Sequence, residues 1–184
     1  GLELIEPVKQ ELLRRFGENA TVIASDKGLE AVVAELLLKK NLTIATAESC
    51  TGGMLAAKLI DYPGISDVYQ EGFVTYTEES KEIRLGVNVE TLEKNGVVSE
   101  EVAKEMAKGV SEVAGTDIGV GITGLAGPNG GTEQTPIGTV YVAIYDRGEY
   151  FVKKMNRFAS RNVIRERAVT IALDELRRIL LQKA

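Results

Sequence analysis

The chain has 184 residues, of which 44% are hydrophobic and 27% charged, with a formal net charge of −5. This composition is typical of one compact globular domain, and the interspersed basic and acidic residues argue against a nucleic-acid partner. No apolar run approaches the roughly 20 residues of a membrane span, and no basic-then-apolar signal opens the chain. We therefore expect no membrane partner and a cytoplasmic location.

Histidine is absent and Cys50 is the only cysteine. A Ser-His-Asp triad, a Cys-His pair, His-bearing zinc sites and an internal disulfide are therefore excluded. Any activated nucleophile must use a lysine or a carboxylate as its base. Acidic residues with metal-ligand spacing are not evident, so we expect no catalytic metal.

The chain begins with helical spacing of apolar residues over Leu2–Phe16, a short strand pattern at 21–25 and a break at 26–28. We expect residues 1–27 to form a helix and strand arm, the tail of a preceding domain, and residues 28–184 to form the main domain. A second amphipathic helix is predicted over Leu29–Lys40.

Residues 42–58 predict a strand, a sharp turn and a helix. The apolar strand pattern stops at a turn made of Glu48, Ser49, Cys50, Thr51, Gly52 and Gly53. Its glycines let backbone N–H groups face outward, so the turn can receive an anion. The same pattern is typical of a plain helix start in which Ser49 or Thr51 only caps the helix.

The remaining pattern alternates strands and helices. A strand is predicted at 68–77, with Gly72 where another backbone approaches, then a helix at 78–85 that carries Lys81 and a helical turn at 88–95. Ser99 begins a longer helix that ends before Gly115, and a strand follows at 117–123. The glycine-rich residues 124–136 are too long for an idle connection and indicate a ligand loop.

Two strands at 138–145 and 149–155 form a hairpin, and a last helix begins near Arg161. Helices between strands predict a three-layer α/β/α domain, and the hairpin makes its sheet mixed, though mostly parallel. The turns at 48–53, 76–81 and 123–131 all follow strands, so we expect them to converge on one crevice.

Several ordered motifs resemble the C-terminal domain of the CinA (competence/damage-inducible) family over residues 29–181. They are A-E-S-C-T-G-G at 47–53, G-F-V-T-Y at 72–76 with Lys81 five residues on, G-V-V-S-E-E-V-A at 96–103, T-G-L-A-G-P-N-G-G at 123–131 and P-I-G-T-V-Y at 136–141. The resemblance implies a five-stranded sheet and a nicotinamide-nucleotide amidase that makes nicotinic acid mononucleotide and ammonia from nicotinamide mononucleotide. It implies no cofactor and leaves a homo-oligomer open. Two departures are Thr77-Glu78, where relatives commonly have S-N, and Ala159-Ser160-Arg161, where many have G-D-R.

We therefore hypothesise that Ser49 attacks the carboxamide carbon and that Lys81 is its base. Backbone N–H groups near residues 51–53 would hold the oxyanion or the phosphate, and the glycine loop, with Arg161 or Arg165, would supply the other site. The predicted substrate contacts are Glu48, Thr51, Gly52, Gly53, Tyr76, Thr123, Gly124, Gly127 and Arg161.

Each role has a simpler alternative. Lys81 lies between Glu78 and Glu82 and is also typical of a solvated ion-pair lysine. Cys50 is either a rival nucleophile or a small buried residue, Tyr76 could pack on the sheet, and both arginines could form a solvated edge. A mononucleotide-binding or regulatory module without catalysis is the alternative function. A nucleic-acid accessory role is disfavoured by the absence of a basic stripe.

Overall fold

The computed structural model describes residues 2–17 and 27–182. Its core is a five-stranded sheet in the order β2-β1-β3-β4-β5. The strands are β1 (Ile44–Glu48), β2 (Tyr69–Val74), β3 (Ile118–Gly124), β4 (Thr139–Asp146) and β5 (Glu149–Asn156). β1 pairs in parallel with β2 and β3, whereas β4 is antiparallel to β3 and β5. The sheet is therefore mixed, as predicted: β4 alone runs against the other four strands, and two of the four pairings are parallel.

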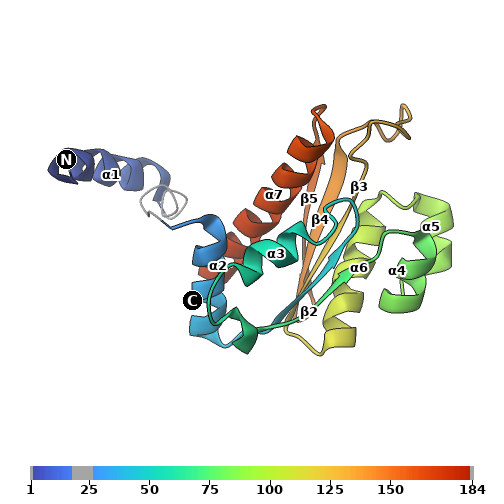
Figure 1. The fold of residues 1–184 in the computed structure, drawn as a ribbon, viewed down its shortest axis with the longest axis horizontal. Helices are drawn as coiled ribbons and strands as arrows, with labels where there is room; N and C mark the ends of the chain where they lie inside the picture. Colours follow the sequence, from blue (N-terminus) through green and yellow to red (C-terminus); the bar gives the residue numbers. More distant parts are fainter. Residues whose placement is uncertain (1, 18–26, 183–184) are drawn as a thin grey trace.

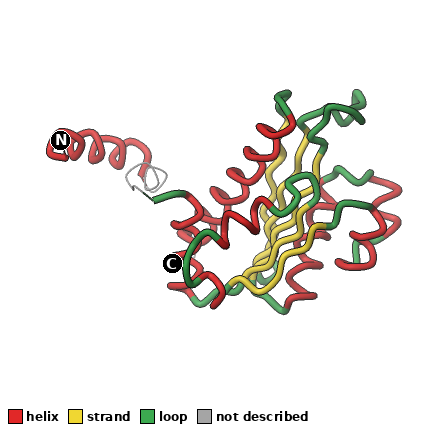
Figure 2. Tube along the Cα trace, in the orientation of Figure 1, coloured by secondary structure: helices red, strands yellow, loops and turns green. Residues whose placement is uncertain are grey.

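Helices cover both faces of this sheet (Figures 1 and 2). One face carries α2 (Leu29–Lys40), α3 (Met54–Ile60) and α7 (Arg161–Gln182). The other carries α4 (Glu78–Leu85), α5 (Val89–Asn95) and α6 (Glu100–Ala114). The remaining helices are α1 (Leu2–Phe16) and the short 3₁₀ helix η2 (Ile65–Asp67). This arrangement confirms the three-layer α/β/α prediction.

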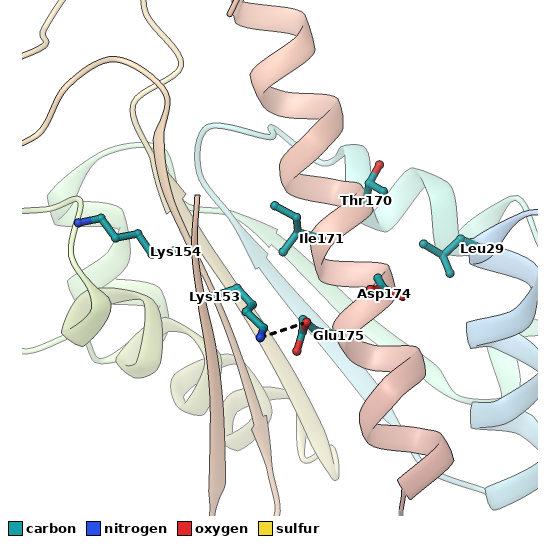
Figure 3. Close-up of a pocket in the computed structure, with 7 residues that line it drawn as sticks. All are labelled: Leu29, Lys153, Lys154, Thr170, Ile171, Asp174 and Glu175. Atoms are coloured by element: carbon teal, nitrogen blue, oxygen red, sulfur yellow. Dashed lines mark ion pairs between the residues drawn. The ribbon is translucent and has the colours of Figure 1, made fainter. Parts of the chain in front are cut away.

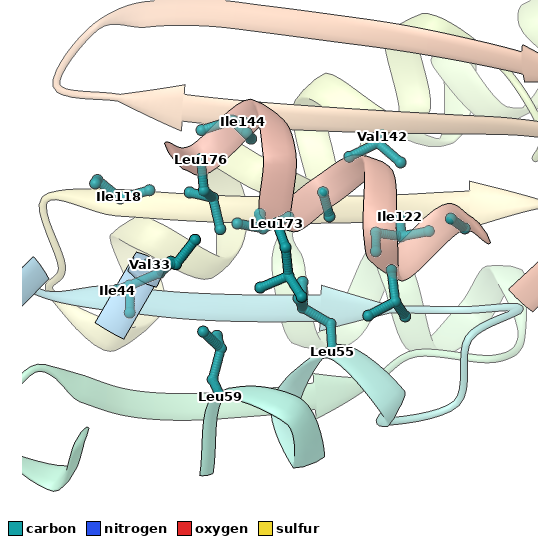
Figure 4. Packing of buried hydrophobic residues seen from close by; sticks show 14 of the residues in the cluster. Val33, Ile44, Leu55, Leu59, Ile118, Ile122, Val142, Ile144, Leu173 and Leu176 are labelled. Atoms are coloured by element: carbon teal, nitrogen blue, oxygen red, sulfur yellow. The ribbon is translucent and has the colours of Figure 1, made fainter. Parts of the chain in front are cut away.

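Successive residues of β3 face opposite sides of the sheet, and the two helical layers pack differently on these two sides. Ile118, Val120 and Ile122 are fully buried in the larger core with residues of α2, α3 and α7 (Figure 4). Burying each such side chain contributes about 1.5–3 kcal/mol. The intervening positions are Gly119 and Gly121, where an added Cβ would lie 1.9 Å from the Ala107 carbonyl oxygen and 2.3 Å from that of Ala103. The backbone of α6 therefore rests directly on β3.

Most predicted elements are found close to their expected bounds. α2 and α4 match the predicted ranges, and Ser99 caps α6 by accepting a hydrogen bond from the Val102 N–H at 3.3 Å. The strand predicted at 68–77 is shorter, because the chain turns after Val74. Gly72 was expected to meet another backbone, but a Cβ there would lie 2.2 Å from the Tyr69 hydroxyl, so a side chain fills the space.

The strand predicted at 21–25 lies outside the described residues. Among the helices of residues 2–17 and 27–182, none is both long and apolar enough to cross a membrane.

Candidate active site

The turn after β1 is built around the carboxylate of Glu48. Its two oxygens accept backbone N–H groups from Gly53 at 3.1 Å, Leu55 at 3.0 Å and Ala56 at 2.9 Å. These are the N–H groups that the start of α3 leaves without a partner within the helix. Glu48 is almost fully buried, so its carboxylate occupies the helix N-terminus that the sequence suggested for a bound anion. We therefore assign Glu48 a structural role in place of the substrate contact expected for it.

Ser49 and Lys81 meet in the buried corner beside this turn. Lys81 Nζ lies 3.3 Å from Ser49 Oγ and donates a hydrogen bond to the Thr75 carbonyl oxygen at 2.8 Å. Lys81 is 0% exposed, so it is not the solvated ion-pair lysine of the alternative interpretation. A capping box between Thr77 and Ser80 starts α4 and fixes the helix from which Lys81 projects.

Burial makes Lys81 unusually easy to deprotonate. Desolvation is the main cause, and it lowers the pKa of Lys81 from 10.5 to about 8 against the opposing effect of the Glu78 carboxylate. Burial acts in the opposite sense on the neighbouring thiol and raises the pKa of Cys50 from 9.0 to about 11. The thiol is therefore protonated at neutral pH, and of the two candidate nucleophiles only Ser49 is within hydrogen-bond distance of the lysine.

Two backbone N–H groups of the turn remain available. Ser49 N–H donates to the Ile122 carbonyl, Gly52 N–H to the Ser49 carbonyl, and Gly53 N–H to Glu48. In the part of the chain that the structure describes, no backbone carbonyl or side-chain oxygen accepts a hydrogen bond from the N–H groups of Cys50 and Thr51. They directly follow the candidate nucleophile, where acyl-transfer enzymes commonly place an oxyanion donor.

A pocket of about 260 Å³ opens above Ser49 and brings the three predicted turns together. The predicted site residues that line it are Ser49, Tyr76, Thr123, Gly124, Gly127 and Arg161. The convergence expected at the strand ends is thus confirmed. The pocket is also lined by residues that were not assigned to the site: Cys50, Val97, Val98, Leu125, Ala126 and Asn129. Val97 and Val98 lie within the motif at 96–103, which was the only sequence signal for them.

Arg161 and Tyr76 form a polar and exposed part of the pocket lining. Arg161 donates to the Gly127 carbonyl at 2.7 Å and to the Tyr76 hydroxyl at 3.1 Å. Tyr76 is 60% exposed, so it does not pack on the sheet. Thr123 is buried and donates from its hydroxyl to the Val97 carbonyl at 2.7 Å, which joins the end of β3 to the pocket wall. Arg161 is therefore held at the pocket by these two contacts, although the residue directly before it is Ser160 and not an acid.

Other predicted residues stand behind the pocket surface. Thr51 is fully buried, and its hydroxyl has no hydrogen-bond partner among the described residues. Gly52 and Gly53 have φ angles of 62° and 90°, in the left-handed region that favours glycine, and so permit the sharp turn. Arg165 donates to the carbonyl oxygens of Cys50 and Thr51 at 3.0 and 2.8 Å, so it is not a solvated edge.

A larger hollow of about 400 Å³ lies between α2, α7 and β5 (Figure 3). It combines apolar residues such as Leu29 and Ile171 with an ion pair between Lys153 and Glu175 at 3.6 Å. It contains none of the predicted site residues, so the smaller pocket is the candidate active site. Within residues 2–17 and 27–182, no group of three or more His, Cys, Asp or Glu side chains could hold a metal ion.

The sequence model of the CinA C-terminal domain matches residues 26–180. The chain belongs to the CinA C-terminal domain family. It is 53% identical over 179 residues to a competence-damage inducible protein of Clostridium botulinum and 52% identical over 182 residues to one of Alkaliphilus oremlandii. These alignments cover 97% and 99% of this chain but 44% of each relative, so the chain spans less than half the length of these relatives.

Solved structures agree with the family assignment. A CinA superfamily protein from Klebsiella pneumoniae has a TM-score of 0.81 at 38% identity, covering 84% of this chain and 96% of that one. The protein CihA from Agrobacterium tumefaciens has a TM-score of 0.76 at 37% identity, covering 82% and 94%. The shared fold therefore covers nearly the whole of each of these solved chains and more than four fifths of this one.

Proposed function

We propose that this domain is an amidohydrolase that converts nicotinamide mononucleotide to nicotinic acid mononucleotide and ammonia, a step of pyridine nucleotide salvage. The observation that carries the proposal is the contact between Ser49, which lines the pocket, and Lys81, which is fully buried and does not line it. A carboxamide requires a nucleophile and a base, and without histidine a serine with a neutral lysine can supply both. The choice of substrate comes from the family resemblance.

Because the pKa of Lys81 is lowered, a substantial fraction of the molecules carries a neutral Lys81 near neutral pH. At pH 7.5, a lysine with a pKa of about 8 is neutral in roughly a quarter of the molecules. A lysine at its ordinary pKa of 10.5 would be neutral in about 0.1%. One N–H of the neutral amine remains bonded to the Thr75 carbonyl, and the lone pair is then free to accept the Ser49 proton.

The reaction then follows as two acyl transfers. Ser49 Oγ bonds to the carboxamide carbon while its proton passes to Lys81, and the developing oxyanion is held by the N–H groups of Cys50 and Thr51. The carbon–nitrogen bond breaks as Lys81 returns the proton to the departing nitrogen, which leaves as ammonia. Water next attacks the acyl-serine, giving its proton to Lys81, and Ser49 regains a proton as the carboxylic acid leaves.

Arg161 is the cation best placed to hold the phosphate of the substrate. It lines the pocket and is exposed, whereas Glu48 fills the helix terminus that could otherwise bind an anion. A guanidinium group can bind phosphate through two parallel hydrogen bonds. The oxyanion is thus assigned to the turn after β1, and the phosphate to the wall formed by Arg161 and the glycine loop.

The direct test is to incubate the protein with nicotinamide mononucleotide and to measure ammonia and nicotinic acid mononucleotide together. We expect both products in equal amounts, and no turnover by the Ser49→Ala variant. Activity should survive exhaustive EDTA treatment. Tight mononucleotide binding by the wild type without either product would replace the proposal with the non-catalytic binding module.

A further inference from the structure

Arg165 contacts the candidate oxyanion turn from the side of α7. Its Nε donates to the Cys50 carbonyl at 3.0 Å, and its second terminal nitrogen donates to the Thr51 carbonyl at 2.8 Å. The Cys50 carbonyl belongs to the same planar peptide unit as the Thr51 N–H, which has no backbone acceptor among the described residues. The guanidinium therefore holds the opposite end of the peptide that would face the oxyanion.

The packing around Gly52 makes this contact close. A Cβ at Gly52 would lie 3.4 Å from the terminal nitrogen of Arg165, so the guanidinium lies against the glycine backbone. Arg165 projects from a part of α7 that is anchored by the buried Ile164 and Ala168. The two donating nitrogens of the guanidinium form a planar fork. This fork is attached to a rigid helix and reaches a turn that has no regular secondary structure of its own.

We propose that Arg165 is a positioning residue for the oxyanion site: its fork fixes the orientation of the Cys50–Thr51 peptide and polarises it, so that the Thr51 N–H becomes a stronger donor. This rests on the proposed acyl-transfer function. Hydrogen bonds that share a peptide unit strengthen one another, and a charged donor at the carbonyl enhances the effect. Arg165 does not line the pocket, unlike Arg161, so it acts through the turn and makes no contact with substrate.

Two features separate this role from others that a partly buried arginine could have. Effects on the base are not expected, because Arg165 bonds to the carbonyls of the turn, whereas Lys81 contacts Ser49 Oγ and a different carbonyl, that of Thr75. Lysine should be a poor replacement, because one ammonium group cannot reproduce the planar fork that meets two carbonyl oxygens.

The experiment compares Arg165→Ala and Arg165→Lys with wild type and with Arg167→Ala. Arg167 lies on the same helix, outside the pocket, and controls for the loss of one arginine from α7. We expect Arg165→Ala to lower kcat about tenfold to a hundredfold with KM nearly unchanged, and Arg165→Lys to recover only a small part of the loss. The pH midpoint of kcat should stay near that of wild type, and Arg167→Ala should behave as wild type. Thermal melting monitors folding of every variant.

A second substrate separates this inference from the proposed function. p-Nitrophenyl acetate needs no nucleotide recognition, and acetylation of Ser49 should release a burst of p-nitrophenolate that is absent in Ser49→Ala. If nicotinamide mononucleotide is not turned over but the burst slows in both folded Arg165 variants, the substrate assignment fails and the role of Arg165 stands. Wild-type rates in Arg165→Ala on both substrates would overturn the role and leave the function intact. A wild-type protein inert to both compounds would overturn both.

Discussion

The pocket has a dry wall, made by Ser49 with the buried Lys81 in contact with it, and a wet wall, made by Tyr76 and Arg161, and the two walls differ in their access to water. On one side Lys81 is 0% exposed and Ser49 8% exposed, whereas on the other Tyr76 is 60% exposed and Arg161 is open to solvent. Charges interact more strongly where water is excluded, and a lysine can act as a base only where burial favours its neutral form. Under the proposed function, we expect the dry wall to set the rate of the chemical step and the wet wall to set substrate affinity. Mutations on the two walls should therefore affect different kinetic constants.

The largest effect is expected from Ser49→Ala, which deletes the nucleophile on the dry wall. We expect kcat to fall by at least about 10⁴-fold, since the loss of a covalent nucleophile commonly costs this much. Mononucleotide affinity, measured by titration calorimetry, should change little because the variant removes one hydroxyl group. Wild-type turnover by Ser49→Ala would show that another group attacks the substrate.

Lys81 tests whether the dry wall supplies a base or only a positive charge. Lys81→Arg keeps the charge but cannot give up its proton at working pH, so we expect it to be nearly as damaging as Lys81→Met, with kcat reduced by about 10³-fold. Steady-state kinetics of both variants decide the question. Near-wild-type kcat in Lys81→Arg would exclude Lys81 as the base, and a loss confined to KM in Lys81→Met would indicate phosphate binding.

Arg161 tests the wet wall. Arg161→Ala should raise KM for nicotinamide mononucleotide by about tenfold to a hundredfold and leave kcat within about threefold, since charge-assisted hydrogen bonds contribute roughly 1.5–3 kcal/mol. Nicotinamide riboside, which lacks the phosphate, should be a poor substrate for wild type and should not distinguish the two proteins. Equal specificity constants for riboside and mononucleotide would remove the phosphate assignment.

Burial of the Lys81 charge should also lower the stability of the fold, by an amount that depends on pH. Below pH 8 the folded and unfolded chains both carry the Lys81 proton, so the cost of burying the charge is fully present. Between about 8 and 10.5 the folded chain loses the proton first, and the free energy of unfolding rises. The free energy of unfolding of Lys81→Met minus that of wild type should therefore be largest at pH 7 and should shrink as the pH rises from 8 to 10.5. Urea denaturation at pH 7, 8.5 and 10 measures this, and a constant difference would contradict it.

Cys50→Ala should have the smallest effect. The thiol has a pKa raised by burial to about 11 and is protonated at neutral pH, so its loss should change kcat and KM by less than about threefold. Kinetics at pH 7.5 check this directly. An inactive but folded Cys50→Ala variant would make the thiol the nucleophile and contradict the assignment of Ser49.

Much of the fold was predictable because its signals are local. The apolar spacing of α2, the cap of α6 and the glycines of β3 each depend on residues close in sequence, and each predicted the observed element. Ser49 could be selected as a candidate for the same reason, since its turn lies between a strand and a helix. Lys81 could not be assigned from its neighbours alone, because Glu78 and Glu82 give it the local pattern of an exposed lysine, and its burial depends on packing against a turn 32 residues away.

The roles of charged side chains were the hardest to predict. Glu48 and Arg165 both look like ligand-binding residues in the sequence, yet one is bonded to the start of α3 and the other to the carbonyl oxygens of the turn. Their partners are backbone groups, which have no signature in the side-chain pattern. The mostly exposed half of the glycine loop, residues 130–136, was likewise indistinguishable in sequence from the half that lines the pocket.

The direct backbone contact between β3 and α6 affects the width of the pocket. Gly119 and Gly121 bring α6 against the sheet, and the chain that leads into α6 carries Val97 and Val98 on the pocket wall. Even a methyl group at either glycine would clash with carbonyl oxygens of α6 and would have to push the helix outward. Substitutions at these two glycines, which do not line the pocket, should therefore change the width of the pocket and the size of ligand that it accepts while every pocket-lining residue stays the same.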